Sequence, residues 1–166
     1  MKKLIAMLVV LCLLPAVLSG CAEDRTDDAP ALYYLYKEPT FGPTGTIFGT
    51  EPLLSEGGED DLIYLLTLYL SGPLSEELRS PFPPETQIED VHQNGSILYL
   101  TMTGSFSQLS STELTKASAC TALTLFENTD ARLLYLTVTD PDADMVRTLE
   151  LTRDSLVLLD NCTTEP

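Results

Sequence analysis

The Asn94-Gly95 pair constrains the fold of this chain more than any other short sequence feature. Asparagine followed by glycine favours a type I′ hairpin turn, because both central positions of that turn need positive φ. The pair separates a short strand expected at 87–92 from a longer one at 96–103. The longer strand alternates as a half-buried strand does, with Leu98, Leu100 and Met102 on one face and Ile97, Tyr99 and Thr101 on the other.

Two helices are expected beside this hairpin. The acidic residues 59–61 favour a helix start, and Ser71-Gly72-Pro73 favours its end. The buried face of this first helix follows the i, i+3, i+4 pattern at Leu62, Leu65, Leu66, Tyr69 and Leu70. Its apolar face is widened by Ile63, Tyr64 and Leu68, which predicts cover on more than one side. Ser110 to Glu113 is a capping box that opens a second helix, whose inner stripe is Leu114, Ala117, Cys120 and the Leu123/Thr124 pair.

Further strands are expected at 31–37 and 131–139, and a terminal hairpin is expected from 145–152 and 155–159, turning at Arg153-Asp154. The resulting order predicts an α+β fold, a βαββαβ sandwich with two helices on one face of a small mixed sheet and an appended C-terminal β-hairpin. The other face of the sheet is then open or covered by residues 38–58, a loop rich in Gly, Pro and Thr.

That long loop is a possible partner-binding segment. Its large apolar side chains are Phe41, Ile47, Phe48, Leu53 and Leu54. If they are exposed, they form a patch suited to a protein partner. The alternative is that they fold back and seal the open face of the sheet, because large exposed apolar patches are uncommon on monomers.

The first 21 residues have the pattern of an export signal. Lys2 and Lys3 precede an apolar run from Leu4 to Val17, and the small residues Ser19 and Gly20 stand before Cys21. This pattern is similar to a bacterial lipoprotein signal, in which the cysteine carries a diacylglyceryl lipid and becomes the first mature residue. An ordinary secretory signal or a short anchor is the alternative. The expected organisation is a signal peptide (1–20), a flexible acidic tether (21–30), a folded domain (31–160) and a tail (161–166), held at the extracytoplasmic face of the cell membrane.

Charge narrows the choice of partners. Loss of Lys2 and Lys3 with the signal changes the formal charge from −16 to −18, with seven basic and 25 acidic residues. So acidic a domain does not bind nucleic acid, whose phosphates need lysine and arginine, and does not dock on an anionic membrane through a basic face. A protein partner with a basic surface is expected instead.

Two cysteines remain after Cys12 is removed and Cys21 is lipidated. In an exported protein Cys120 and Cys162 are permitted to form a disulfide. The preferred interpretation is that Cys120 is a buried thiol that acts as a small apolar residue.

Several short motifs, taken in order, resemble the GerMN domain, the sporulation and spore germination family. Leu65–Pro73 and then Ser80–Ile88 resemble that family's helix, Gly-Pro pair and small-Pro-x-Gly-Thr turn before a strand. Leu98–Phe106, followed by a helix with Thr121–Phe126, resembles its strand, Ser-x-x-Phe and helix section. The similarity covers about residues 60 to 140. The chain departs from the family at Glu85, where the family tends to have Gly, and in the 38–58 insertion.

This resemblance implies a lipoprotein whose domain is similar to the ring-building modules of envelope assemblies, and it supplies no catalytic residues. The residues themselves suggest little chemistry. His92 lies near the hairpin turn with Asp90 on the same strand face, and is expected to be solvated. The acidic loop Asp140 to Asp144 offers oxygens to Ca²⁺ but lacks the glycine and distal glutamate of an EF-hand, so solvated turn acids are preferred. No catalytic residue, metal or other cofactor is therefore assigned.

The sequence thus favours a non-enzymatic, lipid-anchored domain that binds other envelope proteins, in sporulation, germination or a related envelope process. One alternative is a surface-tethered enzyme or solute-binding lipoprotein that acts on cell-wall material or a small ligand. Another is a Ca²⁺-responsive adhesion module.

Overall fold

The structure, a computed structural model of the 166-residue chain, describes residues 30–40, 46–54, 62–140 and 145–155. Several expectations lie outside these residues: the leader with Cys21, the tether, Phe41, the acidic residues 59–61, Asp142 and Asp144, the strand arm 156–159, and Cys162. No helix in the described ranges is long and apolar enough to cross a membrane. The elements in chain order are β1 (Ala31–Tyr36), β2 (Phe48–Pro52), α2 (Leu62–Leu70), β3 (Leu78–Arg79), β4 (Gln87–Asn94), β5 (Ile97–Thr103), the 3-10 helix η2 (Gly104–Gln108), α3 (Ser111–Asn128), β6 (Leu133–Asp140) and β7 (Met145–Thr152).

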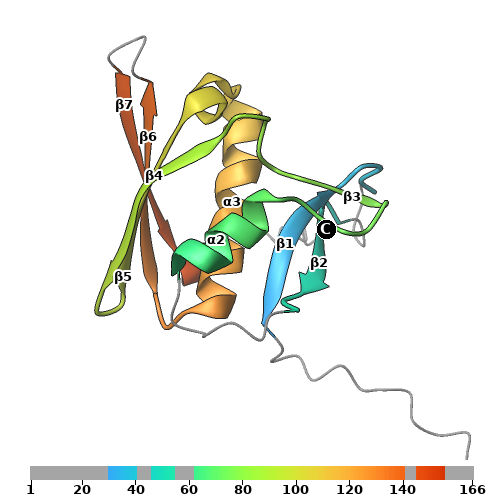
Figure 1. Ribbon diagram of the computed structural model, residues 1–166, viewed down its shortest axis with the longest axis horizontal. Coiled ribbons are helices and arrows are strands. Elements are labelled where there is room, and N and C mark those ends of the chain that lie inside the picture. The colour runs from blue at the N-terminus through green and yellow to red at the C-terminus, as the bar shows by residue number, and fades with distance from the viewer. Residues whose placement is uncertain (1–29, 41–45, 55–61, 141–144, 156–166) are drawn as a thin grey trace, which may run out of the picture.

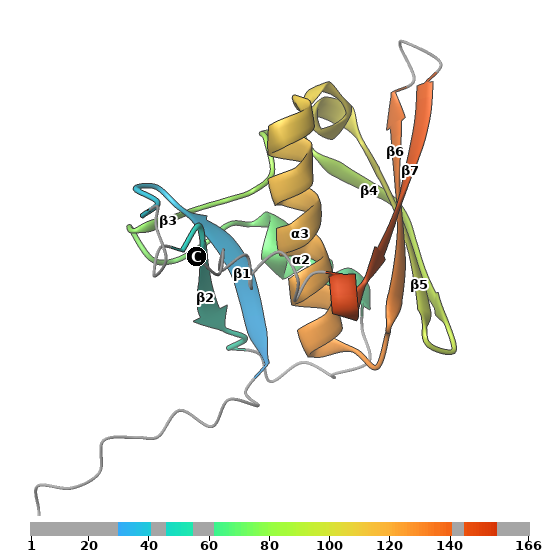
Figure 2. The ribbon, with the colours of Figure 1, turned by 180° about the vertical axis from the view of Figure 1, so that it is seen from behind.

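The elements form three layers, with α2 and α3 between two small sheets (Figure 1, and from behind in Figure 2). One sheet has the strand order β4-β5-β6-β7, and the other has the order β2-β1-β3. The α+β class predicted from the sequence is therefore confirmed. The strand arrangement differs in one respect. Strand β1 does not join β4, β5 and β6 in one mixed sheet, but lies with β2 and β3 in a second sheet on the opposite side of the helices.

Helix α3 is the centre of the core, because it has a sheet on each side. Its expected inner stripe is buried, apart from the half-buried Leu123. Burial continues around the helix to Ser118, Ala119, Thr121, Ala122, Leu125 and Phe126. The Ser110 hydroxyl accepts a hydrogen bond from the Glu113 amide at 3.3 Å, as a capping box requires. The Glu113 carboxylate, however, pairs with Lys116 and Arg79 instead of returning to the start of the helix.

One edge of β1 is completed by helix side chains instead of a full strand. Strand β3 pairs only with the end of β1, at Leu35 and Tyr36. Earlier along that edge, the Tyr33 amide donates to Thr124 Oγ1 at 2.9 Å and the Tyr33 carbonyl accepts from the Tyr69 hydroxyl at 2.5 Å. The Ala31 carbonyl accepts from Asn128 Nδ2 at 2.8 Å.

The geometry of this contact follows from the two repeats involved. Thr124 and Asn128 are four residues apart on α3, roughly 6 Å along the helix axis. Ala31 and Tyr33 are two residues apart on β1, roughly 6.6 Å along the strand. Because the two spacings nearly coincide, one helix face satisfies backbone groups that a neighbouring strand would otherwise satisfy.

The β4–β5 hairpin is confirmed, but its turn differs from the expected type. Asn94 pairs with Ile97, so Gly95 and Ser96 are the two central residues. Gly95 has a φ of 61°, whereas Asn94 and Ser96 are not among the described residues with positive φ. A glycine with positive φ at the first central position alone is the pattern of a type II′ turn.

The C-terminal half of the four-stranded sheet corrects the expected terminal hairpin. Strand β6 pairs in parallel with β5, and β7 pairs antiparallel with β6 from Asp140–Met145 to Leu133–Thr152. The first arm of the predicted hairpin, 145–152, therefore pairs with β6, the strand before it in the chain. The rest of the second arm, 156–159, lies outside the described residues. Arg153, expected in a turn, donates to the Phe126 carbonyl and lies over the Phe126 ring at 5.7 Å from its centroid, which fixes the end of β7 to the C-terminal turn of α3.

Two of the three residues that widen the apolar face of α2 are exposed, which corrects the expectation that the helix is covered on more than one side. Leu65, Leu66 and Tyr69 are buried, whereas Ile63 and Tyr64 are 64% and 46% exposed. The Tyr69 ring contacts both Tyr34 and Phe82, and Phe82 in turn contacts Phe106. The helix ends as predicted, because Gly72 takes a φ of 89° just after its last turn.

The segment before strand β4 contains a non-glycine residue in the left-handed region. Glu85 has a φ of 67°. Its carbonyl oxygen lies where a side chain on Gly104 would stand, 2.4 Å from the ideal Cβ position, and the Ser105 hydroxyl donates to the Pro84 carbonyl. This turn therefore packs directly on η2.

We predict that Thr124→Val destabilises the protein by about 1–2 kcal/mol, because the half-buried Tyr33 amide loses its hydrogen bond to Thr124 while the side-chain volume is conserved. The matched control is Thr121→Val on the same helix. The buried Thr121 hydroxyl bonds only to the Ala117 carbonyl, which also has its helical partner, so we expect a smaller loss. Urea denaturation of both variants measures the difference, and equal losses would contradict the role assigned to Thr124.

A second prediction concerns backbone strain. Glu85→Gly is expected to stabilise the protein by about 0.5–1 kcal/mol, the relief of a left-handed non-glycine residue less the added entropy of the unfolded chain. Glu85→Ala keeps the Cβ atom and is the control, for which no gain is expected. Thermal unfolding of the three proteins provides the test, and an equal gain in both variants would mean that the side chain, not φ, is responsible.

Candidate functional site

The side of the four-stranded sheet turned away from the helices is the candidate site, and we refer to it as the outer face. Along β5 and β6 every second residue is buried against the helices, and the intervening residues point outward and are half-buried. In Figures 1 and 2 no described element lies over this side of the sheet. The outward residues of these two strands are Ile97, Tyr99, Thr101, Thr103, Leu133, Tyr135, Thr137 and Thr139.

Three rings form a row across the outer face. His92, Tyr99 and Tyr135 are aligned by the strand registers of β4, β5 and β6. The His92 and Tyr99 rings stack with centroids 4.9 Å apart and planes 15° apart, and the Tyr99 and Tyr135 rings stack at 5.5 Å and 23°. These separations are close to the spacing of neighbouring strands. The rings therefore stand upright and stack on one another, so that their edges face solvent.

The row begins at an exposed histidine. His92 Nδ1 lies 2.8 Å from Asp90 Oδ2, and both side chains are more than half exposed, at 58% and 60%. The sequence placed these two residues on one strand face, which is confirmed. Their exposure gives them contact with water, in line with the solvated histidine expected.

A β-bulge adds a second acidic group to the outer face. The register between β4 and β5 shifts between Ile88 and Asp90, which leaves Glu89 as the extra residue. Glu89 Oε2 accepts a hydrogen bond from Thr139 Oγ1 at 3.1 Å, although Thr139 lies on β6, two strands away. Bulges re-aim side chains in this way, and here the result is a carboxylate lying across the sheet.

The outer face is acidic at its rims and mostly uncharged in its middle. Glu89 and Asp90 lie on β4, and Glu150 lies on β7 opposite Tyr135. Lysine and arginine are absent from the outward positions of the described strand residues, because Arg147 pairs with the inward-facing Val138. In the middle, the Thr137 and Thr148 hydroxyls lie 3.2 Å apart. Such a face suits a partner of positive charge.

The apolar loop residues identified from the sequence lie elsewhere. Phe48 belongs to β2, an edge strand inside the segment expected to be a loop, and pairs with Leu35 of β1. Phe48 and Leu53 pack against the core, Ile47 is half-buried, and Leu54 is 75% exposed. Phe48 lies in the three-stranded sheet, and Ile47, Leu53 and Leu54 lie next to the ends of β2, on the far side of the helices from the outer face. This placement corrects the expectation that these described residues seal that face.

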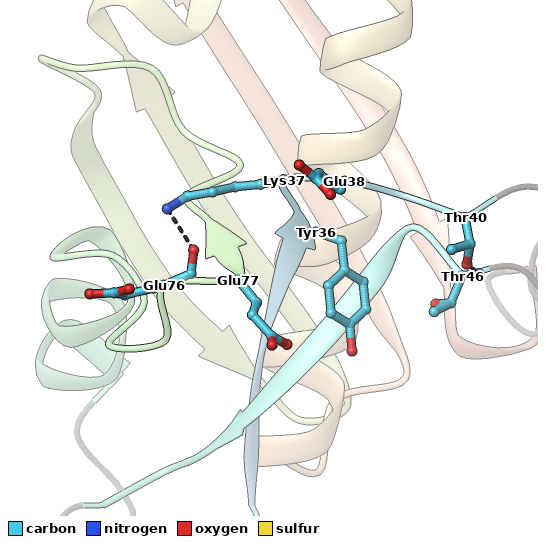
Figure 3. Close-up of a pocket in the computed structure, with 7 residues that line it drawn as sticks. All are labelled: Tyr36, Lys37, Glu38, Thr40, Thr46, Glu76 and Glu77. Carbon is cyan, nitrogen blue, oxygen red and sulfur yellow. Dashed lines mark hydrogen bonds between the residues drawn. The ribbon is translucent and has the colours of Figure 1, made fainter.

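A pocket of about 570 Å³ lies at the end of β1 (Figure 3). It is lined by Tyr36, Lys37, Glu38, Thr40, Thr46, Glu76 and Glu77. The Lys37 ammonium donates to the Glu76 carbonyl at 2.7 Å, and every lining residue except Tyr36 is exposed. The walls of the pocket are therefore polar, with one ammonium, three carboxylates and two threonine hydroxyls among the lining side chains.

Cys120 has the character expected of a structural thiol. It is a free cysteine without exposed surface in the middle of α3. Burial raises the pKa of its thiol to about 12, which keeps it in the unreactive neutral form at physiological pH. The described residues contain no group of three histidine, cysteine, aspartate or glutamate side chains able to hold a metal ion.

Sequence reasoning missed most of the outer face. Tyr99 was placed on the outward side of its strand and His92 beside the hairpin, but neither was connected to Tyr135 or Glu150. A signal was present, because Tyr135 alternates with the buried Leu134 and Leu136 and therefore points outward too. What the sequence lacked was the register that brings the rings together.

Comparisons with protein-family models, with curated proteins and with solved structures found no match for this chain.

We predict that iodoacetamide at pH 8 leaves Cys120 unmodified in the folded protein and modifies it after unfolding in urea. The reason is the combination of complete burial and a thiol pKa of about 12. Mass spectrometry of the peptide that contains Cys120 gives a site-resolved measurement. Rapid modification without urea would contradict the structural assignment.

Proposed function

We propose that this protein is a lipid-anchored, non-enzymatic domain that binds other envelope proteins through the outer face of its four-stranded sheet. The anchor is a diacylglyceryl lipid on Cys21 and places the domain at the extracytoplasmic side of the cell membrane. The sequence from Lys2 to Cys21 supports this part of the proposal, because a charged start, a short apolar run and small residues precede the cysteine.

The observation that carries the binding proposal is the uncovered outer face. The helices cover one side of the sheet, and the other side presents a stacked aromatic row with threonine and aliphatic neighbours. Aromatic side chains are enriched in the centres of protein interfaces, and polar groups are enriched at their rims. The arrangement of the rings and of Glu89, Asp90 and Glu150 matches that pattern.

The tether allows a weak interface to be occupied, because it keeps the domain close to the membrane. Nine residues, 22–30, separate Cys21 from β1 and reach at most roughly 30 Å when extended. Confinement within that distance of the membrane raises the effective concentration of the domain for a partner in the same membrane. A mature chain (residues 21–166) with a formal charge of −18 favours a partner with basic surface.

We further propose that the domain is of the GerMN type and acts in sporulation, germination or a related envelope process. The backbone at Glu85 supports this proposal. The chain takes a left-handed φ of 67° where the family pattern has glycine, and glycine is the residue that this conformation favours.

A crosslinking experiment in living cells tests the function. A photoreactive residue replaces Thr101 on the outer face, and in a control protein it replaces Leu74, which is 84% exposed and lies outside that sheet. We expect an envelope protein to be captured from Thr101 and not from Leu74. We also expect Cys21→Ser to lose both lipid labelling and this capture, whereas Cys162→Ser retains both.

Two results would contradict the proposal. One is a labelled, membrane-bound Cys21→Ser protein, which would exclude the anchor. The other is equal capture, or no capture, from Thr101 and Leu74, which would exclude the outer face as the binding surface.

A further inference from the structure

The aromatic row is open at one end. Tyr135 stacks one ring face on Tyr99 of β5, which lies on one side of β6. Strand β7 lies on the other side of β6, so the second face of the Tyr135 ring is directed toward β7. There the cross-strand neighbour is Glu150, which is not aromatic and does not continue the stack.

Glu150 is exposed, and its carboxylate makes no ion pair or hydrogen bond with the described part of the chain. Its carboxylate is therefore available beside a ring face on which no other ring of the described residues stacks. An aromatic face attracts a cation through its quadrupole, and a carboxylate attracts the same cation by charge. The two groups together suit a cation that is also planar.

We propose that Tyr135 and Glu150 form a docking site for an arginine side chain of a partner protein. The guanidinium stacks on the free face of Tyr135 as the next member of the row, and its N–H groups donate to the Glu150 carboxylate. Arginine is preferred over lysine because its planar group stacks on aromatic rings and donates two parallel hydrogen bonds, whereas an ammonium is a compact point charge. This inference rests on the proposed function, since it names the chemistry by which the partner is recognised.

Two other occupants fit the geometry less well. A sugar ring stacks on an aromatic face that lies flat toward solvent, but the rings here stand upright and each of the three has at least one face stacked on a neighbouring ring. A second copy of this chain would place Glu89, Asp90 and Glu150 against the same three carboxylates, within a domain of formal charge −18. Charge complementarity favours a cationic partner over both.

The test is calorimetric titration of the full-length lipoprotein, purified in detergent, with capped peptides of alternating glycine and arginine, glycine and lysine, or glycine and glutamate. We expect the arginine peptide to bind about two- to fivefold more tightly than the lysine peptide, and the glutamate peptide not to bind. Tyr135→Leu keeps the charge of the protein and is expected to abolish the preference for arginine. Glu150→Gln is expected to weaken binding of both cationic peptides about two- to fivefold.

Matched controls separate the site from general attraction to an acidic protein. Tyr64→Leu makes the same change on the exposed side of α2, and Glu77→Gln removes an exposed carboxylate near β3. Neither is expected to alter the preference for arginine over lysine. Equal effects of Tyr135→Leu and Tyr64→Leu, or equal affinities of the two cationic peptides, would overturn the proposal.

Two further outcomes would also overturn it. Binding of a chitin tetrasaccharide that is lost in Tyr135→Leu would assign the site to a glycan, and a dimer in solution that is dispersed by Tyr135→Leu would assign it to self-association. Failure of the arginine site is distinguishable from failure of the proposed function. In the first case the partner still crosslinks to Thr101 and tolerates Tyr135→Leu, and in the second no partner crosslinks there.

Discussion

The architecture depends on how β1 is completed along one edge. The amide and carbonyl of Tyr33 bond to the hydroxyls of Thr124 and Tyr69, and the Ala31 carbonyl bonds to Asn128. Backbone polar groups left without partners inside a protein cost a large fraction of its total stability. These side chains allow a three-stranded sheet with a very short third strand to pack on the helices. The middle layer is thus joined to the smaller sheet by specific polar contacts as well as by apolar packing.

The sequence was informative wherever a local rule decided the structure. The alternation in β5, the serine cap of α3, the glycine after α2 and the buried Cys120 each follow from residues close together in the chain. Prediction from the sequence failed where the structure depends on pairing between distant segments of the chain. Strand β2 lies in a segment rich in Gly, Pro and Thr because β1 offers it an edge, and the apolar pattern of Ala31–Tyr36 does not reveal which sheet it joins. The exposure of Ile63 and Tyr64 likewise depends on which side of α2 is covered.

In the candidate site, too, local features could be predicted from the sequence and contacts between distant strands could not. Outward positions on single strands are readable from alternation, so Tyr99 and Tyr135 could each be assigned to the solvent side. The stacked row needs the parallel register of β5 and β6, and the placement of Glu89 needs a bulge that no short motif specifies. The candidate surface is therefore a product of the tertiary fold, made from residues that are unremarkable one at a time. Its rim of carboxylates and its aromatic middle are the properties on which the proposed partner recognition depends.

The position of β1 has a mechanical consequence for the anchoring at Cys21 that we propose. When the outer face is held by a partner and the lipid is held by the membrane, any tension between them enters the domain at Ala31 and leaves through the four-stranded sheet. The force path then crosses the bonds of Ala31 and Tyr33 to α2 and α3. Those three bonds and the four-stranded sheet carry the same force in series, and three side-chain bonds are weaker than continuous strand ladders. The smaller sheet is therefore expected to separate from the helices before the proposed binding surface changes shape.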